Sequence, residues 1–376
     1  MPSTSALSGI PELSLSAAAN SDYRLVGEGA ANAVFEVVVP PSDRICREIF
    51  QGRLLRVPKA GTSAHSCFEI QEYWETAVRP LFEPEDLVQH QLIKLGQDAV
   101  TSQLNSALAR ADHFRRADFR GSRVAATEYG MLVEDMRPKH PDDLVLEFKP
   151  KWLAQSPGAP TSATRCRTCA REALKLHTKP HKTGPNLQIL CPLDLLACGS
   201  SPRALSNTLT HLTSLPPPLY TQQTTRPTDQ HRRRLAHWLQ TNTLLPRLRA
   251  AQVANAGTGV LGAGENGDGD GDGDGDGDGD SDSDSARLQL AMTLRDCTCF
   301  VRIPADPRAP VEAKLADLDK KNAAAKLGYW RATERRLIEG GYYEGREVPR
   351  ERTDCQFERG MWSFLEGEAR SAGSLE

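Results

Sequence analysis

A run of alternating glycine and aspartate, Gly267–Asp280, divides this 376-residue chain into two blocks that must fold on either side of it. Such a run offers no apolar surface to bury, so we predict that residues 251–286 form a disordered linker between core elements. The stretch Asp268–Asp272 imitates the start of a calcium-binding EF-hand loop. The twelfth loop position is Gly279 instead of the glutamate that such a loop requires, so the pattern does not favour a calcium site.

The acidic linker masks a positive net charge on the rest of the chain. Residues 251–286 contain nine Asp, Glu265 and no Lys or Arg, so removing them turns a net charge of −3 into +7. A basic remainder favours an anionic ligand. Nine cysteines without a secretory signal indicate reduced thiols, and residues 1–20 read as a flexible leader. We therefore expect a nuclear or cytoplasmic monomer, with no membrane partner because no apolar run is long enough to span one.

The strongest local pattern is a short buried strand that ends between two lysines. Residues 144–148 are apolar apart from Glu147, and Pro150 ends the strand because it cannot donate a hydrogen bond. Lys149 and Lys151 then project from the same side of an extended backbone. Two fixed cations suit a multiply phosphorylated ligand, although a strand end with solvated lysines is the alternative interpretation.

The N-terminal part reads as strands at 23–26, 34–39 and 52–59, with small residues at the first turn. A tight turn such as Gly27-Glu28-Gly29-Ala30-Ala31-Asn32 can offer backbone N–H groups to phosphates, or it can be a plain hairpin turn. Arg56 and Lys59 are cations on the third strand. A strand at 129–133 precedes Glu134 and Asp135, where a two-lobed ATP-binding fold places its adenine hinge.

The C-terminal part has two further candidate sites. Cys166, Cys169, His177 and His181 are four potential zinc ligands, but their continuous helical pattern over 164–175 favours cysteines packed within a helix. Asp296 and Asp317 each stand beside a predicted strand and near basic residues. Such a pair suits Mg²⁺ and a general base in phosphoryl transfer, or it caps strand ends.

The remaining elements follow from composition and periodicity. Residues 200–230 are rich in Ser, Thr and Pro and predict a loop. Residues 231–248 have the spacing of a basic amphipathic helix, and residues 323–339 that of a second helix.

Taken together, these segments resemble the inositol-pentakisphosphate 2-kinase family. The resemblance covers residues 22–340 through six motifs in the family's order: Gly27-Glu28-Gly29-Ala30-Ala31-Asn32, Leu54-Leu55-Arg56-Val57, Glu147-Phe148-Lys149-Pro150-Lys151, Pro192-Leu193-Asp194-Leu195, Arg295-Asp296-Cys297, and Asp317-Leu318 with Tyr329 downstream. The resemblance implies an α+β fold, a divergent protein-kinase-like fold with two lobes. It also implies transfer of phosphate from ATP to the 2-hydroxyl of inositol pentakisphosphate, with Mg²⁺ as cofactor.

The resemblance also implies roles for particular residues. Residues 27–32 would cover the ATP phosphates and Arg56 would bind these phosphates. Glu134, Asp135 and Glu147 would lie near the adenine. For the substrate, the implied residues are Lys149, Lys151, Arg167, Lys321 and Tyr329. Asp296 would accept the hydroxyl proton with Lys149 beside it, and Asp317 would bind Mg²⁺ with Asp296.

The expected organisation is a leader at 1–20, an N-lobe at 21–140, a C-lobe at 141–250 and 287–345 that the linker interrupts, and a tail at 346–376. Two alternatives stay open. One is a kinase of the same fold with another inositol-phosphate substrate. The other is a non-catalytic protein that binds an inositol phosphate or nucleic acid, although nucleic acid is not the expected partner.

Overall fold

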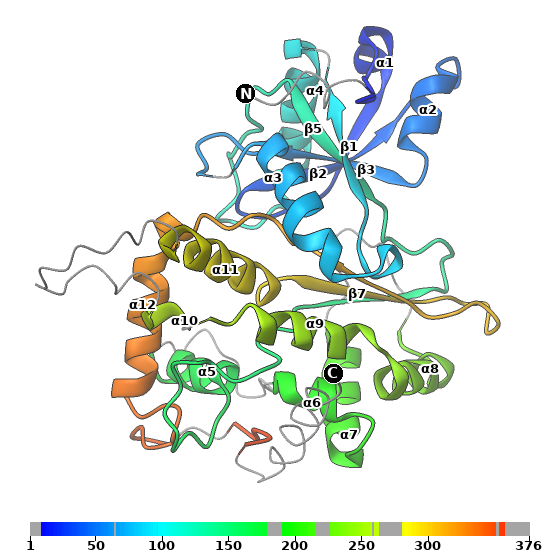
Figure 1. The fold of residues 1–376 in the computed structure, drawn as a ribbon. Helices are drawn as coiled ribbons and strands as arrows, with labels where there is room; N and C mark the ends of the chain where they lie inside the picture. The colour runs from blue at the N-terminus through cyan, green and yellow to red at the C-terminus, as the bar shows by residue number, and fades with distance from the viewer. Residues whose placement is uncertain are drawn as a thin grey trace, which may run out of the picture. The chain divides into compact units, whose positions relative to one another are not determined.

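The chain forms two compact units of mixed helices and antiparallel sheets, which confirms the predicted α+β class (Figure 1). Among described residues, unit 1 extends to Val145 and unit 2 begins at Leu146. The computed structural model describes residues 9–63, 65–95, 97–178, 190–215, 226–257, 259–262, 280–350 and 353–357. Within these ranges, no helix has both the length and the apolar character that crossing a membrane requires.

Unit 1 is built on a five-stranded antiparallel sheet in the order β1-β2-β3-β5-β4. Its strands are β1 (Asp22–Glu28), β2 (Asn32–Val38), β3 (Arg53–Pro58), β4 (His90–Lys94) and β5 (Tyr129–Glu134). Alternate side chains of these strands, among them Phe35, Leu55 and Leu132, enter one apolar core. The three predicted N-terminal strands are therefore present.

The helices of unit 1 are α1 (Leu15–Asn20), α2 (Arg44–Phe50), α3 (Cys67–Tyr73) and α4 (Gln97–Ala111). The flexible leader expected at 1–20 is wrong for residues 15–20, which form α1. Ala17 and Ala18 of this helix are buried in the same core as Leu104 of α4. Ser66 and Glu69 form a capping box that begins α3.

Unit 2 contains a three-stranded sheet in the order β6-β7-β8, and the boundary between the units falls within β6. The strands are β6 (Leu144–Phe148), β7 (Thr298–Ile303) and β8 (Glu312–Ala316). The helices are α5 (Arg167–Thr178), α6 (Pro192–Ala197), α7 (Pro202–Ser214), α8 (Asp229–Thr241), α9 (Leu244–Ala254), α10 (Gly259–Gly262), α11 (Asp280–Leu294) and α12 (Ala323–Glu339).

Three predictions for unit 2 need correction. The loop predicted at 200–230 begins with α7, because Ser201 caps the helix and Leu212 is buried on its inner side. The helix predicted at 231–248 is two helices, because the Asn242 side chain accepts from the N–H of Leu245 and starts α9 anew. Both ends of the linker expected at 251–286 are helical, and residues 263–279 lie outside the described residues.

The close approach of β5 and β3 at Gly130 gives a stability prediction. A Cβ added at Gly130 would lie 3.0 Å from Leu55 Cδ1 and 3.2 Å from the Arg56 carbonyl oxygen. We expect Gly130→Ala to lower the free energy of unfolding by about 1–3 kcal/mol through overpacking. Gly328→Ala, in the open on α12, is the control and should raise it by about 1 kcal/mol. Urea unfolding measures both variants. An unchanged free energy of unfolding in Gly130→Ala would contradict this packing.

Candidate functional site

Charged side chains of unit 2 lie together at one edge of its sheet, where β6 and β8 end and β7 begins. Lys149 directly follows β6 and Lys151 lies two residues further on, Asp296 lies two residues before β7, and Asp317 directly follows β8. The pairing of Thr298 with Ala316 brings the two aspartates to the same edge. The structure thus unites four residues that the sequence analysis placed in one site.

The lysines and aspartates of this cluster contact one another directly. Lys149 Nζ lies 3.0 Å from an Asp317 carboxylate oxygen, 3.4 Å from Asp296 Oδ1 and 2.8 Å from the Asp296 carbonyl oxygen. Lys151 Nζ lies 3.0 Å from Asp296 Oδ1, and Lys321 Nζ lies 3.5 Å from Asp296 Oδ2. Asp296 therefore sits among three cations while its side chain stays 48% exposed, so solvent and a ligand can reach it.

This arrangement changes the protonation behaviour of the cluster. Burial alone would raise the pKa of Asp296, but Lys321, Lys149 and Lys151 outweigh it, and the pKa lies well below its ordinary value. Burial also opposes the charge of Lys149, yet Asp317 and Asp296 hold its pKa above the ordinary value. Lys151 differs, because burial, with a smaller contribution from the cations Lys149 and Arg171, outweighs the opposing effect of Asp296 and lowers its pKa.

Two residues of the cluster adopt left-handed backbone conformations. Lys151 has φ +59° and Asp317 has φ +57°, values that cost a non-glycine residue roughly 1–2 kcal/mol. The buried Gln252 of α9 holds the first in place. Its side-chain amide donates to the Lys151 carbonyl oxygen at 2.9 Å and accepts from the Leu153 N–H at 2.8 Å. Strain of this kind, held by its surroundings, is common at functional sites.

Beneath the cluster, Trp152 lies between two arginines. The guanidinium carbon of Arg167 is 4.2 Å from the Trp152 ring centroid, and that of Arg295 is 3.9 Å from it. Trp152 follows Lys151 in the chain, and Arg295 precedes Asp296. Two segments of the chain are therefore joined twice. Lys151 contacts Asp296 at the surface, and their neighbours Trp152 and Arg295 contact each other beneath it.

A buried carboxylate anchors this stack. Glu334 of α12 accepts from Arg167 Nε at 2.7 Å, and its other oxygen accepts from the Ser156 hydroxyl at 2.7 Å and the Tyr343 hydroxyl at 2.6 Å. Sequence reasoning missed Glu334 and Gln252. The sequence did carry a pattern that could have identified Glu334 as buried, because it shares a helical face with the apolar Trp330 and Leu337.

The predicted substrate residues Arg167 and Tyr329 lie in different surroundings. The side chain of Arg167 is only 6% exposed and is occupied by Glu334 and Trp152, so the structure gives it a supporting position. Arg171, one helical turn later, donates to the Tyr329 hydroxyl at 3.4 Å and lowers the pKa of that phenol. It is also close enough to affect the pKa of Lys151. Arg171 is therefore a more accessible cation of α5 than Arg167, and the sequence analysis overlooked it.

In unit 1, the predicted phosphate-binding turn is a tight hairpin between β1 and β2. The N–H of Gly29 donates to the Asn32 carbonyl oxygen at 2.9 Å, and the N–H of Lys59 donates to the Ala31 carbonyl oxygen at 2.8 Å. Glu28 does not face solvent. Its buried carboxylate pairs with Lys59 Nζ at 2.6 Å and with Arg115 at 2.7 Å, so it fixes the base of the turn.

The other predicted nucleotide residues have mixed surroundings. The Glu134 N–H donates to the Gln89 carbonyl oxygen at 2.8 Å and the Asp135 N–H donates to that of Gly52 at 3.0 Å. The Asp135 carboxylate pairs with Arg137. Arg56 is half-buried on β3, and Glu147 is exposed on β6. Their roles toward a nucleotide stay predictions.

Comparison with known proteins supplies the family. The family model described as inositol-pentakisphosphate 2-kinase matches residues 25–336. A curated protein named inositol-pentakisphosphate 2-kinase, from Yarrowia lipolytica, is 26% identical over 309 residues, which cover 77% of this chain and 86% of that protein. The matched region includes the hairpin of unit 1 and the charged cluster of unit 2.

Because Glu334 anchors the buried stack, we expect Glu334→Gln to lower the free energy of unfolding strongly. This change leaves Arg167 buried without its carboxylate, and removal of one partner of a buried ion pair costs about 3–5 kcal/mol. Glu339→Gln, exposed on the same helix, is the matched control and should be close to neutral. Denaturant unfolding measures both, and equal stabilities would show that Glu334 does not anchor the stack.

Proposed function

The chain belongs to the inositol-pentakisphosphate 2-kinase family, and we propose that it transfers the γ-phosphate of ATP to the 2-hydroxyl of inositol 1,3,4,5,6-pentakisphosphate. The observation that carries the proposal is the concentration of Lys149, Lys151 and Lys321 around Asp296. A pentakisphosphate carries on the order of eight to ten negative charges near neutral pH, so it requires several converging cations. The product is inositol hexakisphosphate.

Asp296 is the proposed general base. The substrate phosphates would compete with Asp296 for the three lysines, and each lysine drawn away removes an interaction that lowers the pKa of Asp296. Binding of substrate therefore makes the carboxylate more basic at the moment when it must accept the 2-hydroxyl proton. Lys149, which contacts both aspartates, would neutralise charge on the transferred phosphoryl group.

The carboxylates of Asp317 and Asp296 fit a magnesium ion. Both are about half exposed, both lie within 3.4 Å of Lys149 Nζ, and oxygen ligands suit this ion. Magnesium usually takes one or two protein carboxylates and completes its shell with phosphates and water. When bound, it would neutralise charge on the ATP phosphates. Lys149 would then exchange its carboxylate partners for phosphate oxygens.

Unit 1 is the proposed nucleotide-binding lobe and unit 2 the lobe for the inositol phosphate, as in a divergent protein-kinase-like fold. The hairpin of residues 27–32 would offer its backbone N–H groups to the ATP phosphates, with Arg56 beside them. Glu134 and Asp135 would lie at the adenine, and Glu147 close to it. In the substrate lobe, Tyr329 and Arg171 would complete the cationic surface begun by the lysines.

The test is phosphate transfer from ATP to inositol 1,3,4,5,6-pentakisphosphate, followed by chromatography of the product. Intact protein should form the hexakisphosphate, and Asp296→Asn should lower kcat by roughly 10²–10⁴-fold with ATP binding retained. Asp306→Asn, an exposed aspartate between β7 and β8, is the control and should keep full activity.

Three outcomes would count against the proposal. Unchanged turnover in Asp296→Asn would remove Asp296 as the base. Turnover of a different inositol phosphate alone would indicate another kinase of the same fold. Binding of the pentakisphosphate without any turnover would indicate a non-catalytic binding protein.

The lowered pKa of Lys151 predicts how activity depends on alkaline pH. Lys151 must be charged to bind a polyanion, and in the free protein it loses its proton below the ordinary 10.5. We expect kcat/KM, which reports the free enzyme, to fall on the alkaline side below pH 10.5. Lys151→Arg keeps the charge and should move this limb to higher pH. An identical pH profile for the two proteins would assign the limb to another group.

A further inference from the structure

Thr293, in the last turn of α11, is hydrogen-bonded to both segments that carry the aspartates of the proposed site. Its hydroxyl donates at 3.1 Å to the carbonyl oxygen of Asp319, two residues after Asp317. Its own carbonyl oxygen accepts from the Asp296 N–H at 3.1 Å. We propose that Thr293 is a positioning residue, which fixes the backbone of Asp317 relative to that of Asp296. The inference rests on the proposed function, because it concerns the two carboxylates proposed there to hold magnesium.

The sheet of unit 2 does not fix this separation by itself. The ladder between β7 and β8 ends at the pairing of Thr298 with Ala316, so both aspartates lie beyond its last pair. Asp317 is also left-handed, at φ +57°, a conformation that persists only where the surroundings hold it. The bond from the Thr293 hydroxyl lies beyond the end of the ladder and joins the two segments a second time.

The surroundings of Thr293 suit a permanent link between these segments. Its side chain is fully buried, and a buried hydroxyl is costly unless it is hydrogen-bonded. Leu318, between Asp317 and Asp319, is buried as well, whereas the Asp317 side chain stays accessible. The link therefore lies beneath the surface and acts on Asp317 through the backbone.

Neighbouring bonds attach the lysines of the site to the same end of α11. The side-chain amide of Gln289, one turn earlier on the helix, donates to the Lys321 carbonyl oxygen at 2.6 Å. The Gln252 amide donates to the carbonyl oxygens of Leu294 and Lys151, at 3.1 and 2.9 Å. The last two turns of α11 thus hold all three segments that meet at the site.

The Thr293 link differs in kind from the ion pairs above it. Lys149 joins Asp296 and Asp317 by charge, and under the proposed function it would exchange both for phosphate oxygens. The two carboxylates would then repel each other. A neutral hydrogen bond between backbone segments does not depend on the partners of Lys149, so it keeps the aspartates in place during this exchange.

The test compares substitutions that remove the hydroxyl with one that keeps it. Thr293→Val keeps the shape of the side chain, and we expect kcat to fall by about 10²-fold, since a misplacement of about 1 Å can cost that much. KM for ATP should change little, because Arg56 and the hairpin proposed to bind its phosphates lie in unit 1. Thr293→Ser keeps the hydroxyl and should restore kcat. Thr208→Val, at another fully buried threonine of unit 2, is the matched control and should keep full activity.

A second measurement does not need turnover. Mn²⁺ stands in for magnesium and is titrated into the intact protein while the EPR signal of the free ion is followed. Removal of a group that orients metal ligands typically costs 10–100-fold in affinity, so Thr293→Val should bind Mn²⁺ at least about 10-fold more weakly. Thr293→Ser should bind Mn²⁺ as the intact protein does. Thr293→Ala also lacks the hydroxyl and takes the place of Thr293→Val if that variant does not fold.

The outcomes separate this inference from the proposed function. Unchanged kcat and Mn²⁺ affinity in Thr293→Val would overturn the positioning role, and so would equal losses in Thr293→Ser. If the intact protein did not turn over the pentakisphosphate but Thr293→Val still weakened Mn²⁺ binding, the proposed function would be refuted and the positioning role supported. Intact protein that neither forms the hexakisphosphate nor binds Mn²⁺ would overturn both.

Discussion

The contact of Trp152 with Arg167 and Arg295 is the interaction on which the site in unit 2 depends. An indole between two guanidinium groups would bring like charges together in a buried place, and the carboxylate of Glu334 makes this tolerable by neutralising one of them. Because the neighbours of Trp152 and Arg295 in the chain are Lys151 and Asp296, a rigid layer beneath the surface positions the reactive layer above it.

In the upper layer, attraction to two carboxylates offsets the repulsion among three lysines. Three lysines would repel one another without Asp296 and Asp317, and two backbone positions in the same layer are left-handed. Gln252 offsets part of this cost through three hydrogen bonds, to Lys151, Leu153 and Leu294. A polyanion that replaces the aspartates as partner of the lysines finds its cations already gathered, so little ordering cost remains for binding.

Local patterns predicted much of the site and of the fold. Lys149, Lys151, Asp296, Asp317 and Lys321 were found from the sequence because strand ends and ordered motifs locate them, whereas the roles assigned to them stay predictions. Arg167 is buried against Glu334 and Trp152, which residue type alone could not predict, and its role toward the substrate stays a prediction. α7 was missed because its Ser and Thr content imitates a loop. Gln252 contacts Lys151 across 101 residues and the Cys355 thiol contacts that of Cys191 across 164 residues, and no local pattern encodes such contacts.

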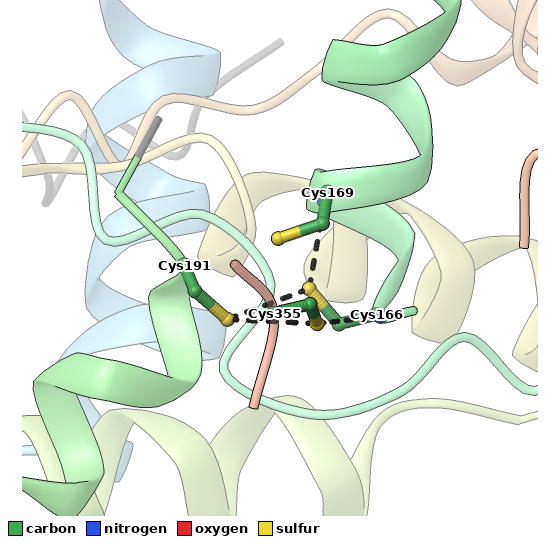
Figure 2. A group of neighbouring side chains, drawn as sticks. All are labelled: Cys166, Cys169, Cys191 and Cys355. Atoms are coloured by element: carbon green, nitrogen blue, oxygen red, sulfur yellow. Dashed lines mark hydrogen bonds between the residues drawn. The ribbon is translucent and has the colours of Figure 1, made fainter. Parts of the chain in front are cut away.

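The position of Cys355 has a consequence for how the chain folds during synthesis. Cys355 packs with Cys166, Cys169 and Cys191 in one buried cluster of unit 2 (Figure 2). These three leave the ribosome early, but Cys355 follows Cys191 by 164 residues. Domains generally fold as units as they emerge. Unit 2 cannot complete this part of its core until almost the whole described chain has been made, and three thiols wait exposed until then. Translation speed and the thiol-reducing capacity of the cell therefore bear on its yield.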